Sequence, residues 1–298
     1  MGGSPIKYRI FRLQNENNVE TIKFLKILNN LEEMKTFSTI ILAIILTCNL
    51  VAAQDTLYIY KSGVVVTKRA VNDIDSVTFY KPLDPAVVKD IDGNVYHTVK
   101  IGTQTWMVEN LKTTKYNDGT SIPLVSDGTT WYNQTTPGYC WYNNTIDNKS
   151  TYGALYNWFT VHTGKLAPIG WHVPTDDEWL VLQDYLIANG YNVDGITISN
   201  LVAKSLAAKT GWNTSTNYGS IGNDLTKNNT SGFTAFPGGA RSLTGTFESI
   251  GYDGYWWSST KYGDYAAKIR YLNSVDCDLG YTDASVWDGL SVRCIRDN

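Results

Sequence analysis

Apolar and polar residues alternate most clearly near the end of the chain, between Gly232 and Asp297. Glycine pairs there separate short aromatic and β-branched runs such as GYDGYWWSST, which predicts brief strands joined by tight turns. Trp256 and Trp257 are neighbours, so they should face opposite sides of one strand, one in the core and the other near a surface. Residues 290–295 predict a last strand that is tied into a sheet. We therefore expect the upstream chain to pack around this segment.

A second alternating run follows the motif DIDGN at residues 90–94. A calcium-binding loop is excluded there, because the glycine lies one place too early and no glutamate follows at the required offset. Asp92-Gly93 instead predicts a hairpin turn, followed by strands over residues 95–101 and 104–110.

Helical periodicity is confined to the middle of the chain. Thr175, with Glu178 three residues later, forms a capping box, and the apolar residues that follow at helical spacing predict a helix that Gly190 ends. Shorter helices are predicted at residues 152–161 and 199–209.

The first 53 residues have the pattern of a targeting region rather than of a fold. Met34 to Ala53 contains one lysine, an apolar run and small residues before the end, which predicts a secretory signal peptide cleaved near Ala53. The apolar run is shorter than the roughly 20 residues that a membrane span needs. We then expect residues 1–33 to be a wrongly assigned leader. An uncleaved anchor and lipidation of Cys48 are the alternatives, and either would be the protein's attachment to a membrane.

Residues 54–82 predict a small β-rich arm after the cleavage point. Two strands flank the turn at Lys61-Ser62-Gly63, and residues 73–79 supply a third candidate strand. Residues 83–89 predict a linker. Because two or three strands are marginal on their own, the arm is either an accessory module or pairs with another element.

Composition and charge narrow the functional classes. A net charge of -3 argues against nucleic-acid binding, which needs a concentrated basic face. Ten Trp and twenty Tyr favour a protein rich in strands and loops. The rings either fill the core or form a recognition surface, and the sequence leaves both open.

Export would leave three cysteines, Cys140, Cys277 and Cys294. In an oxidising compartment we expect a disulfide between Cys277 and Cys294, with Cys140 buried and free. A redox or metal site is the alternative, but the cysteine spacings match no metal-ligand pattern and the chain has three histidines. We expect no metal and no cofactor.

Three arginines stand beside glycine and strand residues near the end of the chain. Arg241, Arg293 and Arg296 could bind an anionic ligand, but we expect structural pairs with Asp297 or Glu248.

Seven stretches of the chain, in the same order, resemble the Fibrobacter succinogenes major paralogous domain, a family abundant in exported proteins of Bacteroidetes-type bacteria. They are VKIGTQTWMVENLKTTKYNDGT, TPGYCWYNN, TYGALYNWFTV, GWHVPTDDEW, GFTAFPGGARS, GYDGYWWSST and GLSVRCIRD. The resemblance implies that residues 90–298 are one α+β domain of the C-type-lectin-like fold, related to formylglycine-generating enzymes. Such a fold has short twisted antiparallel strands, two or three helices and long loops, here preceded by the β arm.

The resemblance also bears on the cysteines. Many members have a cysteine where this chain has Ala167, and that cysteine would pair with the one corresponding to Cys294. The family's bridge is therefore missing here, and Cys277 would have to replace it.

The resemblance implies where the protein is located more directly than it implies what the protein does. Gly-flanked aromatic loops favour a non-enzymatic binding module, secreted or on the outer cell surface, that recognises an unknown extracellular protein or glycan. The candidate ligand-binding residues are Tyr252, Tyr255, Trp257, Tyr262, Tyr271, Tyr281 and Trp287.

Two other functions are alternatives. The arm could add a strand to a neighbouring subunit, which would make the protein a structural surface subunit. An enzyme of the formylglycine-generating or hydrolytic type would need a close cysteine pair or an acid–base constellation. His97, His162 and His172 stand in unrelated contexts, so the sequence names no catalytic residue, and it does not set the oligomeric state.

Overall fold

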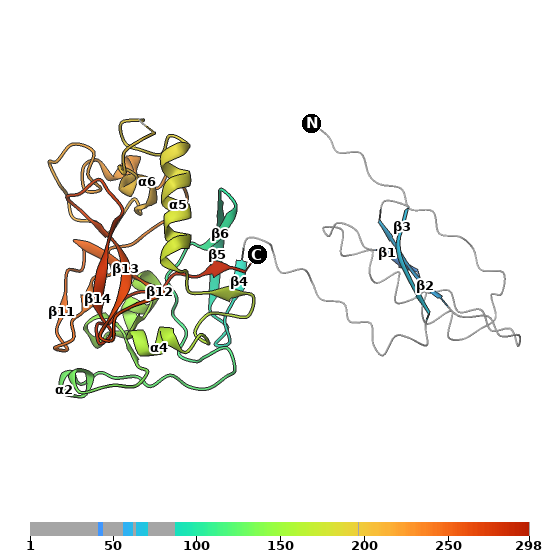
Figure 1. Cartoon of the computed structure of the whole chain (residues 1–298), viewed down its shortest axis with the longest axis horizontal. Helices are drawn as coiled ribbons and strands as arrows, with labels where there is room; N and C mark the ends of the chain where they lie inside the picture. The colour runs from blue at the N-terminus through green and yellow to red at the C-terminus, as the bar shows by residue number, and fades with distance from the viewer. Residues whose placement is uncertain (1–40, 44–55, 62–63, 71–86, 196, 298) are drawn as a thin grey trace, which may run out of the picture. The chain divides into compact units, whose positions relative to one another are not determined.

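The computed structural model describes residues 41–43, 56–61, 64–70, 87–195 and 197–297. The chain divides into two units, Met1–Phe79 and Tyr80–Asn298. In the first unit, three antiparallel strands form a sheet of order β1-β2-β3, made of β1 (Ile41–Ala43), β2 (Thr56–Lys61) and β3 (Val64–Ala70) (Figure 1).

Strands β2 and β3 are the two strands predicted for the arm. Strand β1 falls inside the segment predicted to be the signal peptide, whose cleavage stays a prediction. The third predicted arm strand at residues 73–79 and the predicted leader at residues 1–33 lie outside the described residues.

The described part of the second unit contains two larger antiparallel sheets and two small ones. The first has the order β4-β5-β6-β15-β9 and consists of β4 (Val87–Lys89), β5 (Val95–Ile101), β6 (Gln104–Met107), β15 (Ile295–Arg296) and β9 (Trp171–His172). The second has the order β12-β13-β14 and consists of β12 (Asp253–Tyr262), β13 (Ala266–Asn273) and β14 (Gly280–Ser285). The small sheets pair β7 (Tyr139–Cys140) with β8 (Leu155–Tyr156) and β10 (Ala240–Arg241) with β11 (Phe247–Glu248).

Most helices of the second unit are short. The described helical segments are α2 (Gly128–Tyr132), η2 (Tyr142–Asn144), η3 (Ile146–Asn148), α3 (Lys149–Tyr152), α4 (Trp158–His162), α5 (Asp176–Ala188), α6 (Ala203–Leu206) and η4 (Leu225–Lys227). Mixed helices and antiparallel sheets confirm the α+β class. Within the described ranges, each helix is too short or too polar to cross a lipid bilayer.

The hairpin predicted at Asp92-Gly93 is confirmed, but its first strand starts earlier than expected. The Asp90 carboxylate accepts the backbone N–H groups of Asp92 at 3.0 Å and Asn94 at 2.9 Å, and Gly93 has a φ of 82°. Strand β4 therefore occupies the end of the predicted linker at residues 83–89. The linker prediction was wrong there, because three residues of this polar-flanked segment pair with β5.

The helix predicted at residues 152–161 is also shorter than expected. Gly153 has a φ of 76°, which breaks the helix, and the next residues pair with β7 as strand β8. Asn157 then starts α4, because its side chain accepts the backbone N–H of Thr160 at 3.1 Å. The helix predicted at residues 199–209 is likewise reduced to α6.

Helix α5 matches the sequence pattern. The Thr175 side chain accepts the backbone N–H of Glu178 at 3.2 Å, and the Glu178 carboxylate accepts the N–H of Thr175 at 2.8 Å. The helix buries its apolar residues Trp179, Leu182 and Leu186. Gly190, with a φ of 76°, follows its end. The capping box is therefore confirmed.

Strand β12 lies between two hydrophobic clusters, and this overturns the expectation that one of its tryptophans approaches a surface. Trp257 packs in a cluster with Tyr156, Leu290 and Val292, whereas Trp256 packs in a second cluster with Trp106, Trp179 and Phe233. Both tryptophans are fully buried. Alternation along the strand was predicted correctly, but core covers both faces of the sheet here.

The Asn110 side chain joins segments that are far apart in sequence. Its amide oxygen accepts hydrogen bonds from the Trp256 indole at 2.8 Å and from the Arg293 guanidinium at 2.8 Å. Its amide nitrogen donates to the Tyr152 carbonyl at 2.9 Å and to the Ser291 hydroxyl at 3.2 Å. We call Asn110 and these four partners the Asn110 junction.

The C-terminal strand is tied into the first sheet, as predicted. Strand β15 lies between β6 and β9, with Ile295 opposite both Trp106 and His172. The chain before it makes single bridges from Leu290 to Tyr156 and from Ser291 to Trp256. The last strand is shorter than predicted, because Leu290 and Ser291 pair with two different segments and so do not extend the ladder of β15.

The capping box predicts a measurable contribution to stability. Thr175→Ala removes the acceptor for the Glu178 N–H and should lower the free energy of unfolding by about 1 kcal/mol. Urea unfolding followed by tryptophan fluorescence measures this change. Thr216→Ala, at another exposed threonine, is the matched control and should leave the unfolding midpoint unchanged. Equal stability of both variants would contradict a role for the cap.

Candidate ligand-binding surface

The seven candidate aromatic residues differ widely in exposure. Trp257 is fully buried and donates its indole N–H to the Tyr156 carbonyl at 2.7 Å, so its prediction as a ligand contact was wrong. Three of the others are half-buried, namely Tyr255, Tyr271 and Trp287. The remaining three are exposed, namely Tyr252 at 56%, Tyr262 at 52% and Tyr281 at 67%.

Strand register separates the candidates onto two faces of the second sheet. Residues directly opposite each other in an antiparallel pair share a face. Tyr255 lies opposite Tyr271, with ring centroids 6.2 Å apart, and Tyr271 lies opposite Gly280. A Cβ atom at Gly280 would collide with the Tyr271 ring, so the glycine lets this ring lie across β14. Tyr255 packs at the edge of the cluster that contains Trp257.

Tyr262 and Tyr281 occupy the opposite face. Tyr281 lies opposite Arg270, and Tyr262 lies opposite Ala266 on the same side of β13. Lys268, between these two β13 positions, lies opposite Asp283. We call Tyr262, Lys268, Arg270, Tyr281 and Asp283 the cationic tyrosine face.

Arg270 is the least expected member of the cationic tyrosine face. Its side chain is 1% exposed and lies 5.4 Å from the centroid of the Tyr281 ring. One guanidinium nitrogen donates to the Asp176 carboxylate at 2.7 Å, at the start of α5. The other two, Nε and Nη1, have no hydrogen-bond partner among the described residues. Unpartnered buried donors are costly, so each calls for an explanation.

Lys268 holds the other end of this face. Its ammonium lies 4.0 Å from the centroid of the Tyr262 ring, a cation–π contact that fixes the exposed ring in place. The run AAKIRYLN carries the signal for both cations, because Lys268 and Arg270 are two residues apart and must share a strand face. Sequence reasoning that followed only the tyrosines missed them.

Trp287 and Tyr252 lie outside this face. The Trp287 ring stacks on Tyr265 with centroids 6.0 Å apart and meets Phe159 edge-on. Tyr252 precedes β12 in the turn that leads into it. The seven predicted residues therefore do not form one patch.

Arg241 and Arg293 are buried structural residues, but not through the expected carboxylates. Arg241 donates to the carbonyls of Gly245, Val125 and Ser126, at 3.0, 2.6 and 2.9 Å. Arg293 belongs to the Asn110 junction, and burial lowers its pKa to about 9. The predicted partners Glu248 and Asp297 are not used by either guanidinium.

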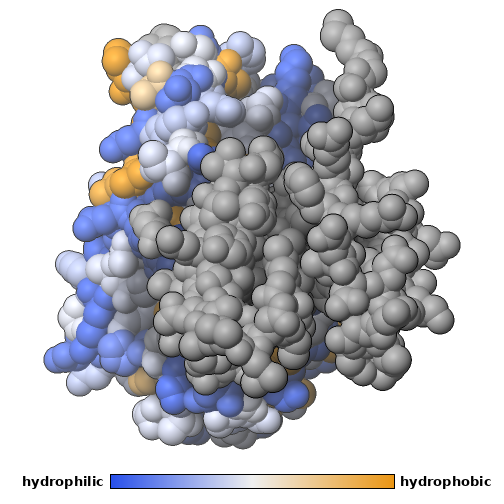
Figure 2. Space-filling model, turned by 90° about the vertical axis from the view of Figure 1, so that its right-hand side faces the viewer, coloured by the Kyte–Doolittle hydropathy of each residue, from blue (hydrophilic) through white to orange (hydrophobic). Residues whose placement is uncertain are grey.

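The surface is largely polar where the described residues can be seen. Figure 2 shows hydrophilic residues over most of the visible described part, with hydrophobic ones in small separate patches.

Two open grooves lie among the described residues. One of about 540 Å³ is lined by Pro123, Val125, Thr129, Thr130, Asn133, Gln134 and Thr136, and one of about 420 Å³ by Asn94, Lys112, Ile146, Asp147, Lys149 and Ser150. Neither groove is lined by a predicted aromatic residue.

A comparison of the sequence with known protein families gives a match that covers most of the second unit. The profile of the Fibrobacter succinogenes major domain matches residues 99–296. The chain belongs to this family. Among curated proteins and among solved structures, none matches the chain. The matched residues contain the whole second sheet, the Asn110 junction and the cationic tyrosine face. They also contain the first sheet except for β4 and the start of β5.

The predicted disulfide of the family domain is not formed. Cys140, Cys277 and Cys294 all carry free thiols. Cys294 is buried in the Trp257 cluster, whereas Cys277 lies in the turn after β13, with its sulfur 3.6 Å from the Tyr218 carbonyl. The two residues therefore pack against different parts of the domain. Cys140 is buried and free, as expected, and burial raises its pKa to about 12.

The three histidines of the second unit have structural partners. His172 on β9 bonds the Glu178 carboxylate at 2.8 Å through Nε2 and the Asp297 carboxylate at 2.6 Å through Nδ1. His97 contacts the Glu109 carboxylate at 2.6 Å, and His162 stacks on Trp158. Among the described residues, no group of three or more His, Cys, Asp or Glu side chains is arranged to hold a metal ion.

The free thiols predict a specific labelling pattern. Cys277 is half-buried, so iodoacetamide should label it in the native protein, whereas Cys140 and Cys294 should react only after unfolding. Burial and the nearby carboxylates of Asp278 and Asp276 raise the pKa of Cys277, so its labelling should accelerate as the pH rises. Peptide mass spectrometry measures the sites. In a chain that starts after Ala53 and so lacks Cys48, Cys277→Ser should abolish native labelling. A linked Cys277–Cys294 peptide under non-reducing conditions would contradict the structure.

The His172 contacts predict a pH-dependent contribution to stability. Burial opposes protonation of the ring, but hydrogen bonds to Asp297 and Glu178 and their charges prevail, so the pKa of His172 is raised above its ordinary value of 6.5. The stabilisation is therefore complete below pH 6.5 and is lost as the pH rises through the raised pKa of the folded state. Urea unfolding at a series of pH values should show a decline with pH that His172→Gln reduces. An NMR titration in which the His172 ring loses its proton below pH 6.5 would refute this prediction.

Proposed function

We propose that this protein is an exported, non-enzymatic binding module that recognises an extracellular protein or glycan through the cationic tyrosine face. The observation that carries the proposal is Arg270, a buried guanidinium with two unpartnered donors beneath the mostly exposed ring of Tyr281. A ligand that packs on the exposed Tyr281 ring and shifts it aside would bring oxygen atoms to these donors, and hydrogen bonds to a charged donor are stronger than neutral ones.

The architecture supports this use of the surface. A three-stranded sheet whose interior positions are filled by Trp256, Trp257 and Ile269 holds the face rigid, so little conformational entropy is lost on binding. Tyr262 and Tyr281 offer exposed rings at its two ends, and exposed tyrosines are frequent anchors in binding sites. A C-type-lectin-like arrangement of the family domain, as the sequence motifs imply, belongs to the same proposal.

A role in binding rather than in catalysis is supported by the two carboxylates near the proposed site, because each already has a structural partner. Asp176, beside Arg270, is committed to that ion pair, and Glu178 to the capping box and His172. Both carboxylates therefore have structural roles at the edge of the proposed site. The signal peptide pattern supports export, with the mature chain starting after Ala53.

Variants on the cationic tyrosine face test the proposal. Arrays of bacterial and host glycans and of extracellular proteins would identify a ligand, and biosensor titration would measure its affinity. Tyr281→Ala and Tyr262→Ala should each weaken binding about tenfold, which is about 1.4 kcal/mol, because each removes an exposed ring. Tyr218→Ala, at a tyrosine that is 85% exposed in a separate loop, is the control and should bind normally. Unchanged affinity in both face variants, with folding intact by circular dichroism, would remove this face from consideration.

A further inference from the structure

The groove lined by Lys112 and Lys149 combines groups that the proposed aromatic site does not use. It is open, measures about 420 Å³, and is lined by Asn94, Lys112, Ile146, Asp147, Lys149 and Ser150. These residues come from three places, namely the β4–β5 turn, the loop after β6 and the η3–α3 segment. Its walls therefore bring together two ammonium groups, one carboxylate, an amide and a hydroxyl.

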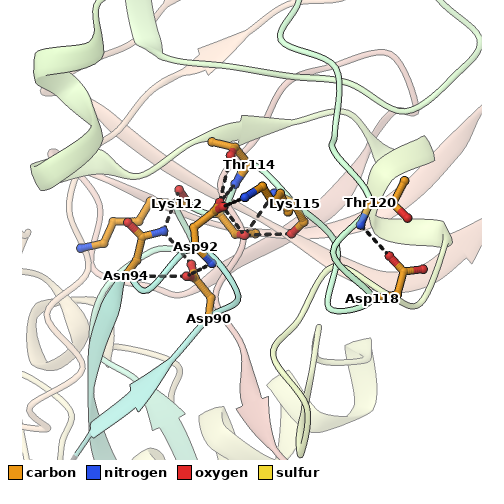
Figure 3. A network of polar contacts seen from close by, with 9 residues as sticks. Asp90, Asp92, Asn94, Lys112, Thr114, Lys115, Asp118 and Thr120 are labelled. Carbon is orange, nitrogen blue, oxygen red and sulfur yellow. Dashed lines mark hydrogen bonds and ion pairs between the residues drawn. The ribbon is translucent and has the colours of Figure 1, made fainter.

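Lys112 is held in place by the network around the β4–β5 turn. Its backbone N–H donates to the Tyr96 hydroxyl at 3.0 Å, and that hydroxyl donates to the Asp90 carboxylate at 2.5 Å. The Lys112 ammonium lies 5.3 Å from the centroid of the Tyr96 ring, which is fully buried. Figure 3 shows the Lys112 side chain extending away from the Asp92 carboxylate, whereas Lys115 pairs with that carboxylate at 3.2 Å.

Lys149 belongs to the η3–α3 part of the groove lining. It is the first residue of α3, and its ammonium lies 5.6 Å from the centroid of the buried Trp141 ring. The preceding η3 turn supplies Ile146 and Asp147, both exposed. Each lysine thus rests on an aromatic ring that limits where its charge can lie.

The two ammonium groups have no counter-ion among the described residues, unlike those of four other lysines of the domain. Lys115, Lys165, Lys227 and Lys261 each pair with an aspartate at 3.0–3.4 Å. In the described part of the chain, neither Lys112 nor Lys149 lies within ion-pair distance of a carboxylate. The groove therefore presents two uncompensated positive charges beside the unpaired carboxylate of Asp147.

A ligand that satisfies all of these groups must carry both a negative charge and hydroxyl groups. An anionic group would lie between Lys112 and Lys149, while hydroxyls would donate to Asp147 and exchange hydrogen bonds with Asn94 and Ser150. A simple inorganic anion would leave Asp147 unmatched and repelling it. We propose that this groove is a binding subsite for a sugar acid, with the sugar carboxylate held by Lys112 and Lys149 and a sugar hydroxyl by Asp147.

Isothermal titration of the full chain with a galacturonate trisaccharide at low ionic strength tests the assignment. The trisaccharide should bind, its methyl ester should not, and added salt should weaken the interaction. Lys112→Gln and Lys149→Gln should each lower the affinity about tenfold, because each removes one charge-assisted contact. Lys227→Gln, at a lysine paired with Asp224, is the matched control and should bind like the wild type. No binding at millimolar concentrations, equal binding of the ester, or unchanged affinity in both lysine variants would overturn the proposal.

Asp147→Ala separates recognition of a sugar from attraction of any anion. If Asp147 accepts a sugar hydroxyl, this variant should bind the trisaccharide more weakly than the wild type does. If the groove merely attracts negative charge, removing a carboxylate should tighten the binding of both the trisaccharide and inorganic sulfate, and the sugar-acid assignment fails. Tyr281→Ala should leave binding at this groove unchanged, so the outcome is independent of the cationic tyrosine face.

Discussion

The packing of the family domain depends on how it accommodates positive charge in its interior. Arg293 is fully buried, and an unpaired charge there would be prohibitively costly without hydrogen bonds. The Asn110 junction supplies the main acceptor, and the Phe233 ring lies 4.4 Å from the guanidinium carbon. Arg241 uses three backbone carbonyls and the Trp131 ring in the same way. Lys204 donates to the carbonyls of Ser220 and Ile221, and burial lowers its pKa. Carbonyl and amide oxygens and aromatic rings thus serve as the partners of these buried cations in place of carboxylates. Each cation binds loops that have little regular structure of their own.

Arg270 departs from this rule. It has a carboxylate partner in Asp176, yet two of its nitrogens lack the carbonyl acceptors that the other buried cations find. The loops around Arg241 and Arg293 wrap their guanidinium groups from several directions. Arg270 lies instead on a sheet face, between the Tyr281 ring and the start of α5. Incomplete satisfaction at this position is consistent with a group whose remaining acceptors come from outside the chain.

Local signals in the sequence predicted local structure well. The Thr175–Glu178 capping box, the Asp92-Gly93 turn and the tied C-terminal strand could all be inferred, because each depends on residues close together in the chain or on simple alternation. The fate of Trp257 and of the Cys277–Cys294 pair could not be inferred, since both depend on which surfaces the fold covers. The two cations of the site could have been recognised from the spacing of Lys268 and Arg270. The burial of Arg270 and its missing partners appear only when α5 is placed against β13.

Gly280 illustrates how a single atom can link two positions in the family. Because the Tyr271 ring lies where a Cβ of residue 280 would be, a larger residue at 280 requires a smaller one at 271. Relatives that lack the tyrosine are free to carry any strand-forming residue at 280. The two positions should therefore change together during evolution. A substitution that enlarges residue 280 at this edge of the sheet requires a second substitution at 271.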